Sequence, residues 1–175
     1  MGKTEDNLQA GFAGESQARN KYTYFAAVAR KEGYHYIASI FEETADNERR
    51  HAKDQFEMLG GIGDTKANLR AAIEGEDYET TTMYPQFAAQ AKEEGNTKAA
   101  VLFEQIAKVE ARHRDRYKEL LQMVESGTVY KREQPIEWKC SVCGYRHTGT
   151  EPPPRCPCCQ HPREYYEPAD MSFSS

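Results

Sequence analysis

The sequence predicts a mainly α protein, in which a four-helix bundle is followed by a small four-cysteine metal-binding domain. Apolar residues recur at helical spacing in four long stretches before residue 127, which is typical of amphipathic helices. All five cysteines and seven of the eight prolines lie after residue 134. A chain of 175 residues accommodates one domain of ordinary size with a small appendage.

Glycines mark the ends of the expected helices. We expect Gly33, Gly60-Gly61 and Gly95 to terminate three of them, because glycine is the usual residue just beyond a helix end. Pro85 should kink the third long helix. The expected long helices span about Thr4 to Gly33, His35 to Leu59, Glu76 to Glu94 and Thr97 to Ser126, with a short helix from about Lys66 to Glu74. Helices of this length bury a core only by packing side by side.

Charge and composition restrict the cellular compartments and the classes of partner that we expect for this protein. The net charge of −5 argues against nucleic acid as a main partner. We expect no membrane association and no export, because the sequence has neither a long apolar run nor a signal-peptide pattern. Five clustered thiols fit a metal site in a reducing, cytoplasmic environment better than a secreted disulfide scaffold.

The helical part contains an internal repeat with an offset of 62 positions. Phe25-Ala26-Ala27 reappears as Phe87-Ala88-Ala89, and Phe41-Glu42 reappears as Phe103-Glu104. The bundle is therefore a duplicated helix pair. A functional residue on one pair should have a counterpart on the other.

The strongest chemical pattern in the repeat is a Glu-x-x-His motif on the second and fourth long helices. Glu48 and His51 recur 62 positions later as Glu110 and His113. A carboxylate and an imidazole three residues apart share one helix face, so both can bind the same ion or adjacent ions. With one glutamate from each remaining helix, this is the layout of di-iron carboxylate bundles. Oxygen and imidazole donors suit iron or manganese.

The first and third helices must complete this site. Glu15 lies on the first apolar face, and its strict counterpart is Asp77, with Glu76 and Glu79 on either side. A one-residue slip of this kind is what a π-type bulge would produce, and such bulges favour functional sites. Glu76, Asp77 and Glu79 all remain candidates. Tyr22 and Tyr84 lie on the inner helix faces, where they either pack in the core or hydrogen-bond to the ligand carboxylates. We expect His35, His147 and His161 in surface or loop positions.

The second chemical pattern consists of two Cys-x-x-Cys knuckles. Cys140 and Cys143 form the first, Cys156 and Cys159 the second, and together they predict a tetrahedral thiolate site for iron or zinc. Cys158 is assigned as a non-ligand, because the other pair keeps the two-residue spacing. A segment of about 30 residues is too short to fold on an apolar core alone, so it needs the metal. We expect Trp138, Tyr145 and Tyr166 to form a small aromatic core beside it.

Several segments together resemble the rubrerythrin family. The motifs are Ala13 to Asn20 on the first helix, Glu42 to Glu48 on the second, Met83-Tyr84-Pro85, and the two knuckles ending in His161-Pro162. Cys158 departs from the family pattern, which has a non-cysteine residue there. The resemblance covers nearly the whole chain. It implies a ferritin-like di-iron bundle over residues 1–132, a rubredoxin-like iron domain over 133–168 and a tail over 169–175.

Specific ligand roles follow from this resemblance. The positions that resemble the family's di-iron ligands are Glu15, Glu48, His51, Glu76, Glu79, Glu110 and His113. The resemblance implies that His51 binds one iron in the reduced state and that Glu79 replaces it on oxidation. Cys140, Cys143, Cys156 and Cys159 resemble the ligands of a mononuclear iron.

The implied activity is a non-haem di-iron peroxidase that reduces hydrogen peroxide to water in oxidative-stress defence. Electrons would pass through the four-cysteine iron to the di-iron centre, because a thiolate-bound iron carries single electrons. The implied partners are hydrogen peroxide and a redox donor, such as rubredoxin or an NAD(P)H-dependent reductase, and the expected assembly is a homodimer. The alternatives are a ferritin-like ferroxidase and an electron-transfer or scaffold protein with zinc in the cysteine site.

Overall fold

The computed structural model describes residues 2–170, so the last five residues of the expected tail lie outside the described part. The chain divides into two compact units, residues 1–63 and 64–175. Across the described residues, no helix is both long enough and apolar enough to cross a membrane.

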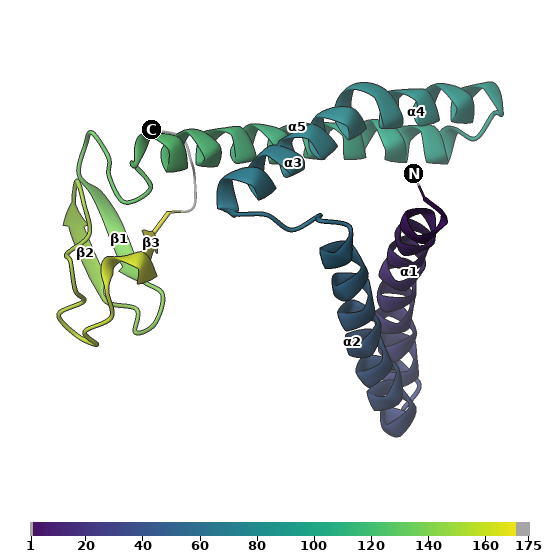
Figure 1. Cartoon of the computed structure of the whole chain (residues 1–175), viewed down its shortest axis with the longest axis horizontal. Helices are drawn as coiled ribbons and strands as arrows, with labels where there is room; N and C mark the ends of the chain where they lie inside the picture. Colours follow the sequence, from purple (N-terminus) through teal and green to yellow (C-terminus); the bar gives the residue numbers. More distant parts are fainter. Residues whose placement is uncertain (1, 171–175) are drawn as a thin grey trace. The chain divides into compact units, whose positions relative to one another are not determined.

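The first unit is a helix pair. Helix α1 (Lys3–Lys31) packs along α2 (His35–Met58), as Figure 1 shows. The connection is a tight turn in which Gly33 has a φ of +87°, a left-handed conformation that favours glycine. Alanines fill the contact, with Ala26, Ala29 and Ala38 buried against one another and Phe41 packed beside them. Small residues at these positions let the two backbones approach closely.

The second unit begins with a helical pair of the same kind. Helix α5 (Thr97–Ser126) packs against α3 (Thr65–Tyr78) and α4 (Tyr84–Glu93), which lie along its two halves in Figure 1. Between α3 and α4 runs the π-helical segment η1 (Glu79–Met83). The four long helices are thereby confirmed, and α5 has the expected bounds.

The prediction of two separate helices, one ending at Glu74 and the next beginning at Glu76, is wrong. Residues 65–93 continue from α3 through η1 into α4, and Gly75 lies within α3. Just before Pro85 runs the π segment, in which the Tyr84 N–H bonds to the Glu79 carbonyl five residues back. Pro85 is the second residue of α4, and the expected kink there stays a prediction.

The repeat predicted from the sequence is present in three dimensions. In the first unit, the rings of Tyr22, Phe25 and Phe41 form a cluster with centroid distances of 5.7–6.3 Å. In the second, the rings 62 positions later form the same cluster at 5.5–6.2 Å, namely Tyr84, Phe87 and Phe103. The Arg30–Glu42 ion pair likewise has its counterpart in Lys92–Glu104. The two pairs are therefore structural duplicates.

The cysteine-containing segment forms a three-stranded antiparallel sheet of order β2-β1-β3. Its strands are β1 (Ile136–Cys140), β2 (Arg146–Gly149) and β3 (Tyr166–Pro168), with the 3₁₀ helix η2 (Arg163–Tyr165) before β3. Cys140 is paired with Tyr166 across β1 and β3. The core consists of Trp138, Tyr166 and two cysteines. The prediction that Tyr145 belongs to this core is wrong. Its side chain is exposed, because it follows the first knuckle on the surface.

Candidate metal centres

The first half of the carboxylate site lies on α1 and α2. Glu15, Glu48 and His51 each offer a ligand atom, and these three atoms lie within 4.8 Å of one another. Nδ1 of His51 lies 2.8 Å from Oε2 of Glu48, as the i, i+3 spacing on one helix face requires. The two carboxylates are partly buried, and the imidazole is exposed.

The second half lies on α3 and α5 and repeats this arrangement. Glu76, Glu110 and His113 form a group of the same kind within the same 4.8 Å limit. Nδ1 of His113 lies 2.7 Å from Oε2 of Glu110 and 3.7 Å from Oε2 of Glu76. Each half therefore provides two carboxylates and one imidazole, which are the donors that iron or manganese accepts.

Asp77, the strict repeat counterpart of Glu15, is engaged elsewhere. Its carboxylate accepts a hydrogen bond from Arg114 at 3.1 Å and forms an ion pair with it. Glu76 takes the position at the site instead. Tyr22 comes seven residues after Glu15, whereas its repeat counterpart Tyr84 comes eight residues after Glu76. The π segment between them absorbs the additional residue, which is the slip predicted from the sequence.

The site's electrostatics show that carboxylates are concentrated there. Burial raises the pKa of Glu76, the Glu110 carboxylate raises it further, and His113 acts in the opposite direction. Burial and the carboxylates of Glu79, Glu110 and Glu76 raise the pKa of Tyr84. Glu79, the first residue of η1, is thus close enough to act on both groups, although it is not part of the three-donor group. Partly buried carboxylates that lie close together favour the binding of a cation.

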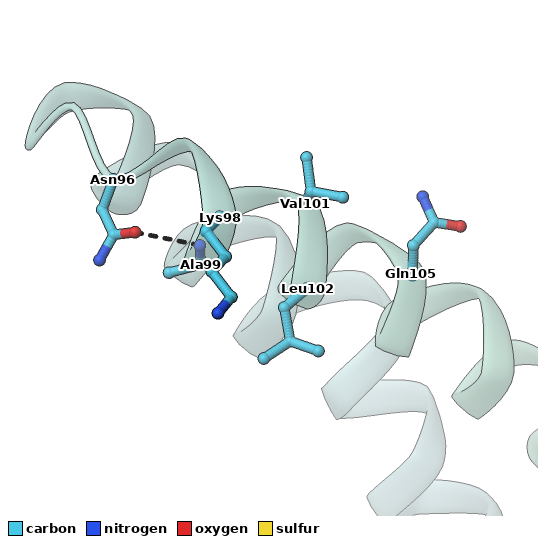
Figure 2. A pocket seen from close by; sticks show the side chains of 6 residues that line it. All are labelled: Asn96, Lys98, Ala99, Val101, Leu102 and Gln105. Carbon is cyan, nitrogen blue, oxygen red and sulfur yellow. Dashed lines mark hydrogen bonds between the residues drawn. The ribbon is translucent and has the colours of Figure 1, made fainter.

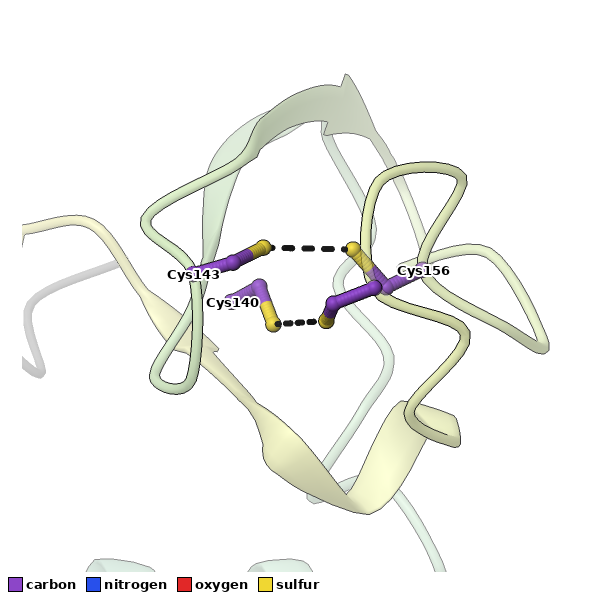
Figure 3. Close-up of side chains that lie close together, drawn as sticks. Cys140, Cys143 and Cys156 are labelled. Carbon is purple, nitrogen blue, oxygen red and sulfur yellow. Dashed lines mark hydrogen bonds between the residues drawn. The ribbon is translucent and has the colours of Figure 1, made fainter.

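The third group is the four-cysteine cluster. Cys140, Cys143, Cys156 and Cys159 bring their sulfurs within 4.8 Å of one another. The sulfurs of Cys143 and Cys156 lie 3.6 Å apart, and those of Cys140 and Cys159 lie 3.7 Å apart. Figure 3 shows the labelled Cys140, Cys143 and Cys156 pointing toward one another. A tetrahedral ion with metal–sulfur bonds of ~2.3 Å requires sulfurs ~3.8 Å apart. The spacing therefore fits a thiolate metal site and is far too long for disulfides.

Main-chain N–H groups point at these sulfurs, as expected for such knuckles. The N–H of Tyr145 acts to lower the pKa of Cys143, although burial and the neighbouring thiols raise it overall. Burial opposes ionisation of Cys156, yet hydrogen bonds that include the N–H groups of Cys159 and Cys158 lower its pKa to about 6. Cys158 itself is exposed and lies outside the cluster.

The remaining histidines are not in these groups. Among the residues that the structure describes, the potential metal-binding groups contain only His51 and His113. His161 packs against the Tyr165 ring at 4.9 Å, so it is a packing residue of the cysteine domain as much as a loop residue.

Comparison with known proteins decides the family. The model of the family described as Rubrerythrin matches residues 6–121, and that of the rubrerythrin rubredoxin-like domain matches residues 138–167. The chain belongs to the rubrerythrin family. The family match confirms the ferritin-like four-helix-bundle class with a rubredoxin-like C-terminal domain.

Full-length relatives agree with this assignment. The chain is 49% identical to a rubrerythrin of Porphyromonas gingivalis, over 98% of this chain and 92% of the relative. It is 45% identical to a rubrerythrin of Nitratidesulfovibrio vulgaris, over 94% of this chain and 93% of the relative. Rubrerythrin-1 of Clostridium acetobutylicum is 44% identical, with the same two coverages. The family resemblance seen in the sequence is thereby confirmed.

Proposed function

We propose that the protein reduces hydrogen peroxide to water at a di-iron centre and receives the electrons through its four-cysteine iron. The observation that carries this proposal is the occurrence of both kinds of donor group in one rubrerythrin-family chain. Two duplicated carboxylate–imidazole groups and one thiolate cluster are present. The overall reaction takes one peroxide, two electrons and two protons and yields two water molecules.

The residues fit the metals that this function needs. We propose Glu15, Glu48, His51, Glu76, Glu110 and His113 as ligands of the di-iron centre, with Glu79 as an additional, oxidation-dependent ligand. We propose Glu48 and Glu110 as the carboxylates shared by the two ions, which is supported by the imidazole that lies beside each of them. A bound pair of ferrous ions supplies the two electrons that cleavage of an O–O bond requires. The four carboxylates of the two groups offset the charge of two divalent cations.

Two of the chain's own groups at this site have raised pKa values. Burial and the neighbouring Glu110 carboxylate raise the pKa of Glu76. The raised pKa of Tyr84 keeps its phenol protonated at neutral pH. The Tyr84 hydroxyl can therefore donate a hydrogen bond to an oxygen species or to a ligand carboxylate.

The cysteine cluster supports an electron-transfer role. Four thiolates complete the coordination of an iron and leave no open position for substrate, so the ion can only exchange electrons. Cys143 is exposed, which gives a donor access to one edge of the cluster. We propose a redox donor protein such as rubredoxin, or an NAD(P)H-dependent reductase, as the source of electrons.

The proposal extends to domains, assembly and compartment. We propose a functional division into a bundle over residues 1–132, an iron domain over 133–168 and a tail over 169–175. A homodimer would let the iron domain of one chain serve the di-iron centre of the other. Five free cysteines are best preserved in a reducing compartment, which supports a cytoplasmic location.

The alternative function is that of a ferritin-like ferroxidase, which would use the same carboxylates. Iron storage does not need a thiolate redox centre in the same chain, so the cysteine cluster favours the peroxidase. The experiment that separates them supplies iron and peroxide to the purified protein. A peroxidase consumes peroxide catalytically with a reductase and accumulates no mineral, whereas a ferroxidase accumulates a ferric core that grows with added iron.

A further inference from the structure

Each helix pair carries only half of a di-iron site, so the source of the other half decides how the site is assembled. Glu15, Glu48 and His51 lie in the unit of residues 1–63, and their duplicates lie in the unit of residues 64–175. Three donors from one pair cannot satisfy two irons. A complete centre therefore needs the three donors of one N-terminal unit and the three donors of one C-terminal unit. This inference rests on the proposed function.

The connection between the two units is short. Helix α2 ends at Met58 and α3 begins at Thr65, so only six residues separate them. Part of this segment is fixed in helix caps. Gly60 has a φ of +70°, and the Gly61 N–H bonds back to Phe56. At the other end, the Asp64 carboxylate caps the N–H of Ala67. Even if fully extended, the connection spans at most about 25 Å, and with its caps intact it spans about 17 Å.

A ferritin-like bundle requires a much longer connection. In this fold one long crossover joins the helix pairs, because the second and third helices run in the same direction. Ten residues separate Glu48 from the end of α2, and eleven separate the start of α3 from Glu76. At 1.5 Å per residue, a crossover that aligns these two glutamates must cover about 31 Å along the axis. The sideways spacing of ~8–10 Å between helices adds to this.

The six-residue connection is too short for this crossover, and we propose that a second copy of the chain supplies the missing half. In this exchanged dimer, α1 and α2 of one copy pair with α3, α4 and α5 of the other. Each di-iron centre then contains Glu15, Glu48 and His51 from one chain and Glu76, Glu110 and His113 from its partner. The dimer has two such centres, related by its two-fold axis.

The apolar surfaces of the helix pairs support this exchange. Among the described residues, those buried in the helices are all alanines. Larger apolar side chains at equivalent repeat positions remain uncovered on both pairs: Phe25 and Phe87, and Ile40 and Leu102. Figure 2 shows Leu102 and Val101 projecting from α5 along a shallow apolar pocket. Duplicated apolar faces of this kind suit burial against each other.

A complementation experiment tests the exchange. One variant carries Glu15→Ala and Glu48→Ala with one affinity tag, and the other carries Glu76→Ala and Glu110→Ala with a second tag. Both are co-expressed, and the doubly tagged heterodimer is purified. In an exchanged heterodimer, the two intact halves meet in one of the two centres. We expect about half of the wild-type bundle iron, counted relative to the four-cysteine iron, and only background iron in each homodimer.

The outcomes separate this inference from the proposed function. A heterodimer with no more bundle iron than the homodimers, beside a wild type with its full complement, overturns the exchange. It would mean that each chain closes its own site, as in a bundle with antiparallel neighbours. Absence of bundle iron from the wild type overturns the proposed function instead. The corresponding Glu→Gln variants keep the experiment decisive if the alanine variants fold poorly.

A longer connection provides a matched test. Insertion of about 14 Gly and Ser residues after Gly61 allows the two halves of one chain to meet. In this background the heterodimer should lose its recovered iron, while the lengthened wild-type chain keeps its full iron content. The same insertion after Glu133, in the connection to the cysteine domain, should leave recovery unchanged. Recovery that persists in the first insertion variant would contradict the proposed role of the short connection.

Discussion

Nδ1 of His113 lies 3.7 Å from Oε2 of Glu76, although Asp77 is the residue that follows Glu15 by the repeat offset of 62. The π segment of residues 79–83 explains the difference. It adds one residue between Glu76 and Tyr84, so Glu76, which comes 61 positions after Glu15, takes the place that the offset of 62 assigns to Asp77. Asp77 is left to pair with Arg114, outside the site.

Deletion of Thr81 should remove the π segment and keep Glu76 at the site. The deletion places Glu76 seven residues before Tyr84, the spacing that separates Glu15 from Tyr22, so an uninterrupted α-helix holds Glu76 at the equivalent position. In the deletion background, Glu76→Ala should lower the affinity of the bundle for iron more than tenfold, whereas Asp77→Ala should leave it unchanged. Iron titration of both variants tests this, and a deletion variant that depends on Asp77 instead of Glu76 would contradict the register argument.

Glu76→Gln should stabilise the metal-free protein near neutral pH. The pKa of Glu76 is raised in the folded state, so the folded state binds its proton more tightly than the unfolded state does. Wild-type stability therefore falls as pH rises from the ordinary glutamate pKa through the raised value. The glutamine side chain does not titrate, so the Glu76→Gln variant does not lose this stability as pH rises. Thermal melts in EDTA should show a higher Tm for the variant at pH 7 and equal values below pH 4, and a gap independent of pH would contradict the assignment.

Cys140→Ser should abolish the visible iron–thiolate absorption while the helices remain folded. The sulfur of Cys140 is buried in the cluster, and the bundle itself contains no cysteine. Cys158→Ser is the matched control, because Cys158 is exposed and outside the cluster. Its absorption spectrum should be that of the wild type. Far-ultraviolet circular dichroism checks the helices, and a colourless Cys158→Ser protein would make Cys158 a ligand.

Glu48→Ala and Glu110→Ala should weaken di-iron binding to a similar degree. The two carboxylates occupy equivalent repeat positions, at 2.8 and 2.7 Å from their imidazoles, and both are proposed to be shared by the two ions. Each variant should lose more than tenfold in affinity, a factor that corresponds to about 1.4 kcal/mol. Glu15→Ala should mainly weaken one iron. Unchanged iron content in Glu110→Ala would rule out the site.

Much of this architecture could be predicted from the sequence because it depends on local patterns. Glycines at 33 and 95 end helices, and the repeat places Glu48 and Glu110 on matching faces. The choice of Glu76 over Asp77 could not be made from the pattern, since it depends on where the helix accommodates the additional residue. The continuity of the helix through Gly75 was also missed, because packing against α5 outweighs the low helix propensity of one glycine.

The most direct test of the central claim is single-turnover stopped-flow absorption. Fully reduced protein is mixed with hydrogen peroxide, and the absorption of the four-cysteine iron is followed. If that iron supplies the di-iron centre, its oxidised absorption should reappear as peroxide is consumed, and Glu110→Ala should abolish the reappearance. A four-cysteine iron that stays reduced while peroxide is consumed would contradict the proposed electron path.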